Sequence, residues 1–162
     1  MIVLDANILL YAYDSLSPYH AKARAWVEST LSGEEPVGLP WQTAAAFLRI
    51  ATNPGIPGER LTLEEAVRVV DQWLEQPNVR LLAPGDGHWS LFRQMAMEGQ
   101  ARGPLITDAQ LAALTIQYGG ILHTTDRDFA RFQRTLRRAQ SLLHPQFVVA
   151  CRHGKSHAAG YH

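Results

Sequence analysis

Short apolar runs alternate along this chain with longer segments in which apolar residues recur every three or four positions. The apolar runs are residues 1–4, 37–39, 79–82 and 121–124. None of them alternates between apolar and polar positions, and continuous runs of this length are typical of strands that are buried on both faces of a parallel sheet. The sequence therefore predicts four buried strands, with residues 1–4 forming the central one.

The segments between these runs have the spacing of amphipathic helices. The helical patterns cover residues 7–13, 21–31, 41–51, 63–74, 89–96 and 108–118. Thr62, with Glu65 three residues later, forms a capping box that marks the start of one of them. Regular alternation of strands and helices favours an α/β fold with right-handed crossovers and a parallel sheet that is covered on both faces.

Length and composition agree with one such domain, because 162 residues with 46% hydrophobic composition suffice for a full core. We expect this domain to span residues 1–150 and the Gly-, Ala-, Ser- and His-containing residues 151–162 to form a disordered tail. The single cysteine, Cys151, indicates a reducing compartment. Neither a leader sequence nor a membrane-length apolar run is recognisable, so we expect a cytoplasmic protein with no membrane partner.

Carboxylates follow two of the predicted strands directly. Asp5 comes after the first strand, and Asp126 comes after the fourth. A third carboxylate, Asp108, lies near the start of a helix, where an acid is often only a cap. The pair Thr107 and Gln110 already has the spacing of a capping box, which leaves Asp108 free to face a ligand.

These acids meet if the first and fourth strands are neighbours, because ligands of open parallel sheets bind beyond the carboxyl ends of the strands. Three carboxylates repel one another and stay ionised together only if a cation compensates their charge. Oxygen ligands without cysteine select Mg²⁺ or Mn²⁺ over zinc. Asp5, Asp108 and Asp126 therefore suggest metal-assisted hydrolysis of a phosphodiester, with a metal-activated water as the nucleophile.

Three segments of the chain together resemble the PIN-domain nucleases, especially the VapC toxins of toxin–antitoxin modules. They are Asp5-Ala6-Asn7, Thr107-Asp108 and Thr125-Asp126-Arg127-Asp128-Phe129, and the resemblance covers roughly residues 1–132. Each motif alone is weak, but their order and their positions after strands strengthen the match.

The resemblance implies a three-layer α/β/α sandwich with a central, mainly parallel sheet. It also implies a Mg²⁺-dependent endoribonuclease that forms a homodimer and is inhibited by a VapB-type antitoxin. Asp5, Asp108 and Asp126 match the metal-binding acids of the family, and Asn7 and Thr125 match polar positions that line its site. The apolar helix with Leu9, Leu10, Tyr11 and Tyr13 is then either buried or part of a groove for an antitoxin helix.

The chain departs from the family pattern in two places. The family usually has a glutamate on the helix after the second strand, but residues 41–49 contain no acid, and Phe47 lies near the expected position. Asp128 could supply a replacement ligand, directly or through water, although it also stands where it would cap the helical run that begins with Phe129. The family's last strand is not recognisable before residue 144, and we expect it at residues 147–149.

Basic residues supply candidate contacts to an RNA backbone. Arg49 lies on a helix that faces the predicted cleft, and Arg127, Arg131 and Arg134 follow the fourth strand. A solvated helix face explains these arginines equally well.

Aromatic residues are less specific. The pair His88-Trp89 could stack on a base, whereas Trp89 alone fits better as a core residue or a dimer contact. Trp26, Trp41 and Trp73 lie on helical faces and fit packing.

Two other functions are compatible with parts of the pattern. The first is a catalytically degenerate PIN-like domain that binds RNA or a partner protein, which the missing glutamate favours. The second is a phosphatase of the haloacid dehalogenase class. That class requires a second aspartate at position 7, and Asn7 argues against it.

Overall fold

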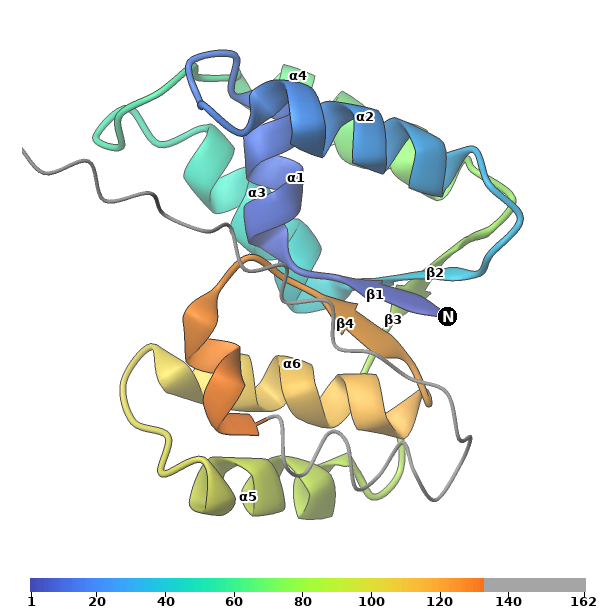
Figure 1. The fold of residues 1–162 in the computed structure, drawn as a ribbon, viewed down its shortest axis with the longest axis vertical. Coiled ribbons are helices and arrows are strands. Elements are labelled where there is room, and N and C mark those ends of the chain that lie inside the picture. Colours follow the sequence, from blue (N-terminus) through green and yellow to red (C-terminus); the bar gives the residue numbers. More distant parts are fainter. Residues whose placement is uncertain (133–162) are drawn as a thin grey trace, which may run out of the picture.

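A computed structural model of the protein describes residues 1–132. Its centre is a parallel sheet with the order β3-β2-β1-β4 (Figure 1). The strands are β1 (Ile2–Leu4), β2 (Val37–Pro40), β3 (Val79–Leu82) and β4 (Ile121–His123). The prediction that the first strand is central is confirmed, because Ile2 of β1 pairs with Val37 on one side and with Ile121 on the other. The first and fourth strands are thus neighbours, which is the condition under which the acids can meet.

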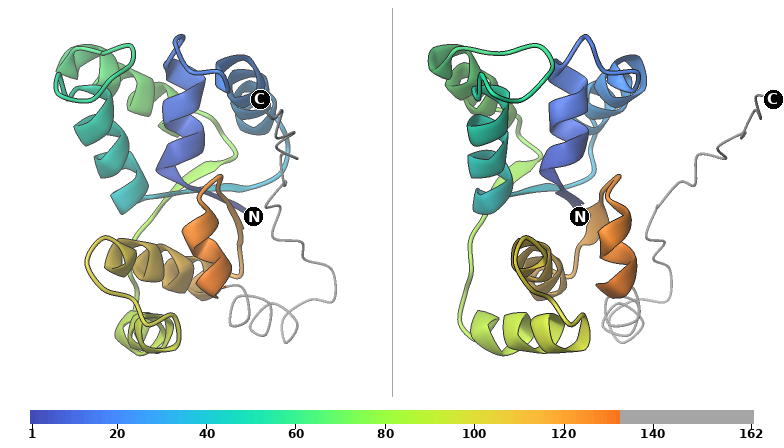
Figure 2. Two further views of the ribbon diagram at one scale, coloured as in Figure 1. Left: turned by 60° about the vertical axis from the view of Figure 1, so that its left-hand side comes forward. Right: turned by 90° about the vertical axis from the view of Figure 1, so that its left-hand side faces the viewer.

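Helices cover both faces of the sheet and give the predicted three-layer sandwich (Figures 1 and 2). The helices on one face are α1 (Ala6–Tyr13), α2 (His20–Leu31), α3 (Trp41–Ala51) and α4 (Leu63–Leu74). The other face carries α5 (His88–Glu98), α6 (Leu105–Gln117) and the short 3₁₀ helix η1 (Arg127–Phe132).

The central strand explains why the apolar runs do not alternate. Ile2 and Leu4 belong to the core under α1–α4, whereas Val3, between them, belongs to the core under α5 and α6. Successive side chains of a strand point to opposite faces, and here both faces are buried. A strand in this position needs apolar residues at every step.

Two helix starts test the predicted caps. The capping box of α4 is confirmed, with the backbone N–H of Glu65 donating to Thr62 Oγ1 at 3.2 Å and that of Thr62 donating to Glu65 Oε2 at 2.8 Å. The capping box predicted for Thr107 and Gln110 is wrong, because α6 begins at Leu105 and its N-cap, Pro104, makes no side-chain cap bond. The fixed φ of proline suits the first turn of a helix, so the helix starts earlier than the polar pattern indicates.

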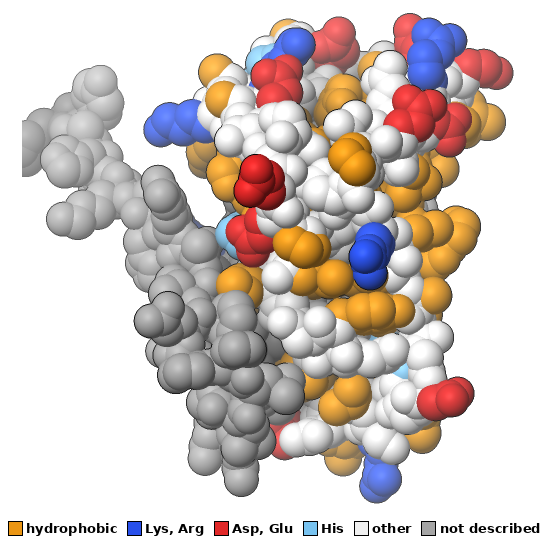
Figure 3. Space-filling model, turned by 90° about the vertical axis from the view of Figure 1, so that its right-hand side faces the viewer, with side chains coloured by type: hydrophobic (Ala, Val, Ile, Leu, Met, Phe, Trp, Pro, Cys, Tyr) orange, Lys and Arg blue, Asp and Glu red, His pale blue; other side chains and the backbone are white. Residues whose placement is uncertain are grey.

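All four strands run so that their carboxyl ends reach one edge of the molecule, where α1, α3, α6 and η1 begin (Figures 1 and 2). The space-filling view in Figure 3 shows the opposite side, on which apolar side chains gather between scattered charged ones. No helix among residues 1–132 is long and apolar enough to cross a membrane. The strand expected at residues 147–149, the domain end at residue 150 and the tail at 151–162 lie outside the described residues.

Candidate functional site

Asp5 is the first acid at the carboxyl edge of the sheet. It follows β1 directly and is the N-cap of α1, since the backbone N–H of Ala6 donates to its Oδ1 at 2.7 Å. Its other oxygen, Oδ2, accepts a hydrogen bond from Thr124 Oγ1 at 2.6 Å. Burial raises the pKa of this carboxyl, the bonds from Thr124 and Ala6 lower it, and the charge of Asp126 raises it further.

Thr124 is the residue of the site that the sequence analysis missed. It is buried, with 4% of its surface exposed, and besides its bond to Asp5 its Oγ1 accepts from the backbone N–H of Asp126 at 2.9 Å. The family resemblance matches Thr125, which is exposed, to a polar position that lines the site. A usable signal was present, because Thr124 lies two residues after the buried Leu122, and residues two apart in a strand share a face.

Asp126 begins the turn into η1. Its Oδ1 accepts from the backbone N–H of Asp128 at 2.8 Å, an Asx turn that starts the 3₁₀ helix. The prediction that Asp128 caps this helix is therefore wrong, because Asp126 provides the cap. Asp128 lies exposed in the first turn, 4.0 Å from the guanidinium of Arg131.

Asp108 reaches the same region from the first turn of α6 and is half-buried. Burial, followed by the charges of Asp126, Asp5 and Asp128, raises its pKa to about 6, and Arg131 acts in the opposite direction. Asp5 and Asp126 are thus close enough to Asp108 for their charges to oppose its ionisation.

The closeness of these acids does not by itself make a metal site. Among residues 1–132, no three side chains of His, Cys, Asp or Glu are arranged to hold a metal ion. Asp5 and Asp126 instead accept hydrogen bonds from Thr124 and from the backbone of Asp128. The oxygen donors and the excess of negative charge fit Mg²⁺ or Mn²⁺ in kind, although the side chains described do not form a set of metal ligands.

The other predicted site residues take different positions. Asn7 is half-buried in the first turn of α1, and its backbone N–H stabilises the charged form of Asp5. Arg49 and Arg127 are exposed. Arg131 Nη1 donates to the carbonyl of Gly99 at 3.3 Å, which ties η1 to the end of α5. Arg134 lies outside the described residues.

The helix that lacks the family's glutamate contributes a core residue near the expected position. Phe47 is fully buried, and its ring lies 4.7 Å from that of Trp73 and 5.7 Å from that of Tyr13. The start of α3 is held to β1 by Thr43 Oγ1, which donates to the carbonyl of Leu4 at 2.8 Å. This bond fixes the first turn of α3 next to Asp5.

The tryptophans differ in burial, and only some of them pack as predicted. Trp73 is buried and Trp26 is half-buried against the ring of His123, as expected for packing. The packing role predicted for Trp41 is wrong, because 58% of its surface is exposed, and Trp89 is also outside the core at 69%.

His88, the neighbour of Trp89, is buried, and its Nδ1 lies 2.7 Å from Gln117 Oε1. Gln117 is the last residue of α6, at the opposite end of this helix from Asp108. The pair His88-Trp89 therefore lies away from the acids.

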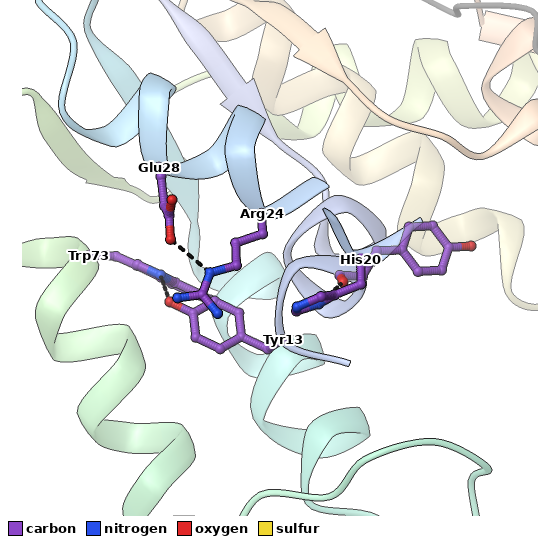
Figure 4. Close-up of polar contacts among 6 residues, drawn as sticks. Tyr13, His20, Arg24, Glu28 and Trp73 are labelled. Atoms are coloured by element: carbon purple, nitrogen blue, oxygen red, sulfur yellow. Dashed lines mark hydrogen bonds and ion pairs between the residues drawn. The ribbon is translucent and has the colours of Figure 1, made fainter. Parts of the chain in front are cut away.

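Two adjoining pockets lie beside α1, away from the acids. Leu10, Tyr11 and Tyr13 line the first pocket, whereas Leu9 of the same helix is fully buried. The second pocket lies between α1 and α2 and includes Arg24 and Glu28, with Arg24 Nε 2.8 Å from Glu28 Oε1 (Figure 4). Tyr13 lines both pockets, and its Oη accepts a hydrogen bond from Trp73 Nε1 at 3.1 Å.

Comparisons with known proteins agree with this geometry. The PIN domain family matches residues 2–135. Ribonuclease VapC33 of Mycobacterium tuberculosis is 39% identical over 132 residues, which covers 82% of this chain and 92% of that protein.

Two solved structures share the fold at lower identity. The crystal structure of Mycobacterium tuberculosis VapC20, a toxin that cleaves the sarcin-ricin loop, has a TM-score of 0.61 at 14% identity and covers 80% of this chain and 93% of that one. VapBC2 from Rickettsia felis, bound to a DNA fragment from its promoter, has a TM-score of 0.58 at 16% identity, over 81% of this chain and 92% of that one.

Proposed function

The chain belongs to the VapC ribonucleases of the PIN domain family, and from this premise we propose that it is a toxin whose endoribonuclease activity requires Mg²⁺ or Mn²⁺. The residues that would hold the ion are Asp5, Asp108 and Asp126, with Asp128 as an additional ligand. The observation that carries this proposal is the meeting of Asp5, Asp108 and Asp126 at one edge of the sheet, where burial, followed by the charges of Asp126, Asp5 and Asp128, raises the pKa of Asp108 to about 6. A divalent cation compensates the charges of these acids.

In this proposal the other side chains at this edge have two roles, positioning the acids and binding the RNA backbone. When bound, the ion supplies Lewis-acid chemistry, neutralising phosphate charge and making a water more acidic. Thr124 orients Asp5 and the start of the turn at Asp126, so it is a positioning residue. Arg49 and Arg127 are exposed cations that bind the RNA backbone in this proposal, as does Arg134 beyond the described residues.

Two protein partners complete the proposal. A VapB-type antitoxin would dock in the pocket beside α1, whose apolar walls include Leu10 and Tyr11. Support comes from the relative VapBC2, a toxin–antitoxin pair by its name. A homodimer is the second proposed assembly. We also propose a cytoplasmic location, where the proposed RNA substrate is found.

A noncatalytic domain that binds RNA or a partner protein is the second candidate. It is favoured by the absence of an acid from α3 and by the fact that no three acids among residues 1–132 stand in ligand positions. The family resemblance to active ribonucleases favours the enzyme.

The deciding experiment incubates the purified chain with single-stranded and structured RNA in Mg²⁺, in Mn²⁺ and in EDTA. Asp5→Asn, purified in the same way, controls for contaminating nucleases. The proposal predicts cleavage by the natural sequence only with the divalent ion and little cleavage by the variant. Cleavage that survives EDTA, or that is equal in Asp5→Asn, contradicts it, and binding without cleavage supports the noncatalytic domain.

A further inference from the structure

Trp41 is a large apolar side chain exposed at the edge of the sheet that carries the acids. It follows β2 directly, and β2 pairs with β1, the strand that ends at Asp5. The bond from Thr43 to the carbonyl of Leu4 holds this turn of α3 beside the residue that precedes Asp5. Tryptophan is strongly buried on average in folded proteins, but 58% of the surface of Trp41 is exposed at this edge of the sheet.

The exposed residues of α3 lie on one face of the helix, which begins at Trp41. Trp41, Ala45 and Arg49 are the exposed residues of this helix, and their spacing of four places them along one face. Arg49 is the only charged residue of α3 and lies about 12 Å along the helix axis from Trp41. The face therefore has an exposed aromatic side chain at its start, in the turn of α3 that lies beside β1, and a cation towards its end.

We propose that Trp41 stacks on an unpaired base of the RNA substrate next to the phosphodiester that is cleaved. This inference rests on the proposed ribonuclease function and names a recognition residue for it. Aromatic side chains stack on any base that is not already stacked in a helix, and cations on the same surface hold the backbone. The substrate is accordingly single-stranded, or has a base turned out, at this position.

A second copy of the chain is the other occupant that an exposed tryptophan suggests. The position of Trp41 favours RNA, because the turn of α3 that carries it lies beside the residue that precedes Asp5, where the proposed substrate binds. Charge favours RNA as well, since α3 carries no acid and its one cation lies on the exposed face. The oligomeric state of the variants separates the two occupants.

The test compares Trp41→Ala and Trp41→Phe with Trp89→Ala. Trp89 is a matched control because it is also exposed, at 69%, and lies at the start of α5, beside the end of α6 and away from Asp108. Two quantities are measured for each protein. One is binding of a labelled single-stranded oligoribonucleotide in EDTA, and the other is cleavage of the same RNA in Mg²⁺ or Mn²⁺.

The expected loss for Trp41→Ala is about 5- to 100-fold in RNA binding and in kcat/KM, the range for one stacked base. Trp41→Phe should retain most of the binding, and Trp89→Ala all of it. In a series of RNAs with one abasic position each, the penalty of Trp41→Ala should disappear at a single position, which identifies the stacked base.

Three results overturn the inference: Trp41→Ala binding RNA as the natural sequence does, an equal loss in Trp89→Ala, or a loss that coincides with dissociation of a dimer in sedimentation. A natural protein that binds RNA but does not cleave it refutes the proposed nuclease activity, while the binding comparison still decides the role of Trp41. If Trp41→Ala is poorly folded, Trp41→Leu, which keeps an apolar side chain without the aromatic ring, replaces it in the binding measurement and in the abasic series.

Discussion

Thr124 Oγ1 donates a hydrogen bond of 2.6 Å to Asp5 Oδ2, joining residues that are 119 positions apart in the chain. The same hydroxyl oxygen accepts from the backbone N–H of Asp126. One buried side chain thus links the acid that ends β1 to the acid that follows β4. The two acids keep their relative position because the adjacent strands are paired and because this hydroxyl bridges them.

Thr124→Val removes the bridge while it keeps the shape of the side chain. Leaving a buried carboxylate without one of its hydrogen-bond donors costs about 1–3 kcal/mol, so the free energy of unfolding should fall by that amount. RNA cleavage should fall as well, because Asp5 is no longer oriented. Thermal unfolding and kcat measure the two effects.

Thr124→Ser and Thr125→Val are the controls for this prediction. The serine retains the hydroxyl and should restore most of the activity, and Thr125 is exposed. Equal activity in Thr124→Val and Thr125→Val would show that the bridge has no role.

The pKa of Asp108 predicts how stability depends on pH without divalent ions. Because the folded-state pKa, about 6, lies above the ordinary value of 3.8, the folded protein binds the proton more tightly than the unfolded chain between these pH values. The contribution of Asp108 to stability is therefore largest at low pH and is lost as pH rises from about 4 to 6. Half-burial leaves the charge partly screened by solvent, so the effect is smaller than the full shift implies.

Asp108→Asn should remove this contribution and make the metal-free protein more stable near pH 7 than the natural sequence. Asp86→Asn, at an exposed carboxylate in the loop before α5, is the matched control. Unfolding by urea at a series of pH values measures the difference. An Asp108→Asn curve parallel to that of the natural sequence would refute the account of this carboxyl.

The burial of Phe47 predicts what happens when an acid is introduced at this position of α3. Its ring is fully buried between Tyr13 and Trp73, so Phe47→Glu would bury a charge in the core and should prevent folding. Phe47→Ala should cost about 3–5 kcal/mol, the usual range for deletion of a buried aromatic ring. Circular dichroism and urea unfolding measure both.

The milder variant Phe47→Leu separates packing from a role at the site. It should lose some stability and leave divalent-ion affinity unchanged. A folded Phe47→Glu protein with increased Mn²⁺ affinity would show instead that this position faces the acids.

The sequence predicted the sheet and the positions of the acids because both follow from local patterns. Strands buried on two faces must be continuously apolar, and Asp5 and Asp126 end such strands directly. The start of α6 could not be predicted from the polar pattern, since Pro104 begins the helix before Thr107. The cap of η1 was misassigned because two aspartates two residues apart compete for the same backbone N–H groups, and only the structure shows that Asp126 bonds to Asp128.

The exposure of Trp41 could not be predicted from the sequence, for a different reason. Residues 41–51 are apolar on nearly all sides, with Arg49 as the only charge. Periodicity identifies a helix there but does not say which apolar side a neighbouring helix covers. The tertiary arrangement of α1, α3 and α4 leaves Trp41 outside the core.

The central claim is that Asp5, Asp108 and Asp126 bind one divalent cation, and calorimetric titration of the purified protein with Mn²⁺ tests it most directly. The account predicts binding by the natural sequence and at least a tenfold weaker affinity for Asp5→Asn, Asp108→Asn and Asp126→Asn, with Asp86→Asn unchanged. Unaltered Mn²⁺ affinity in a folded variant of any one of the three acids would contradict a shared site.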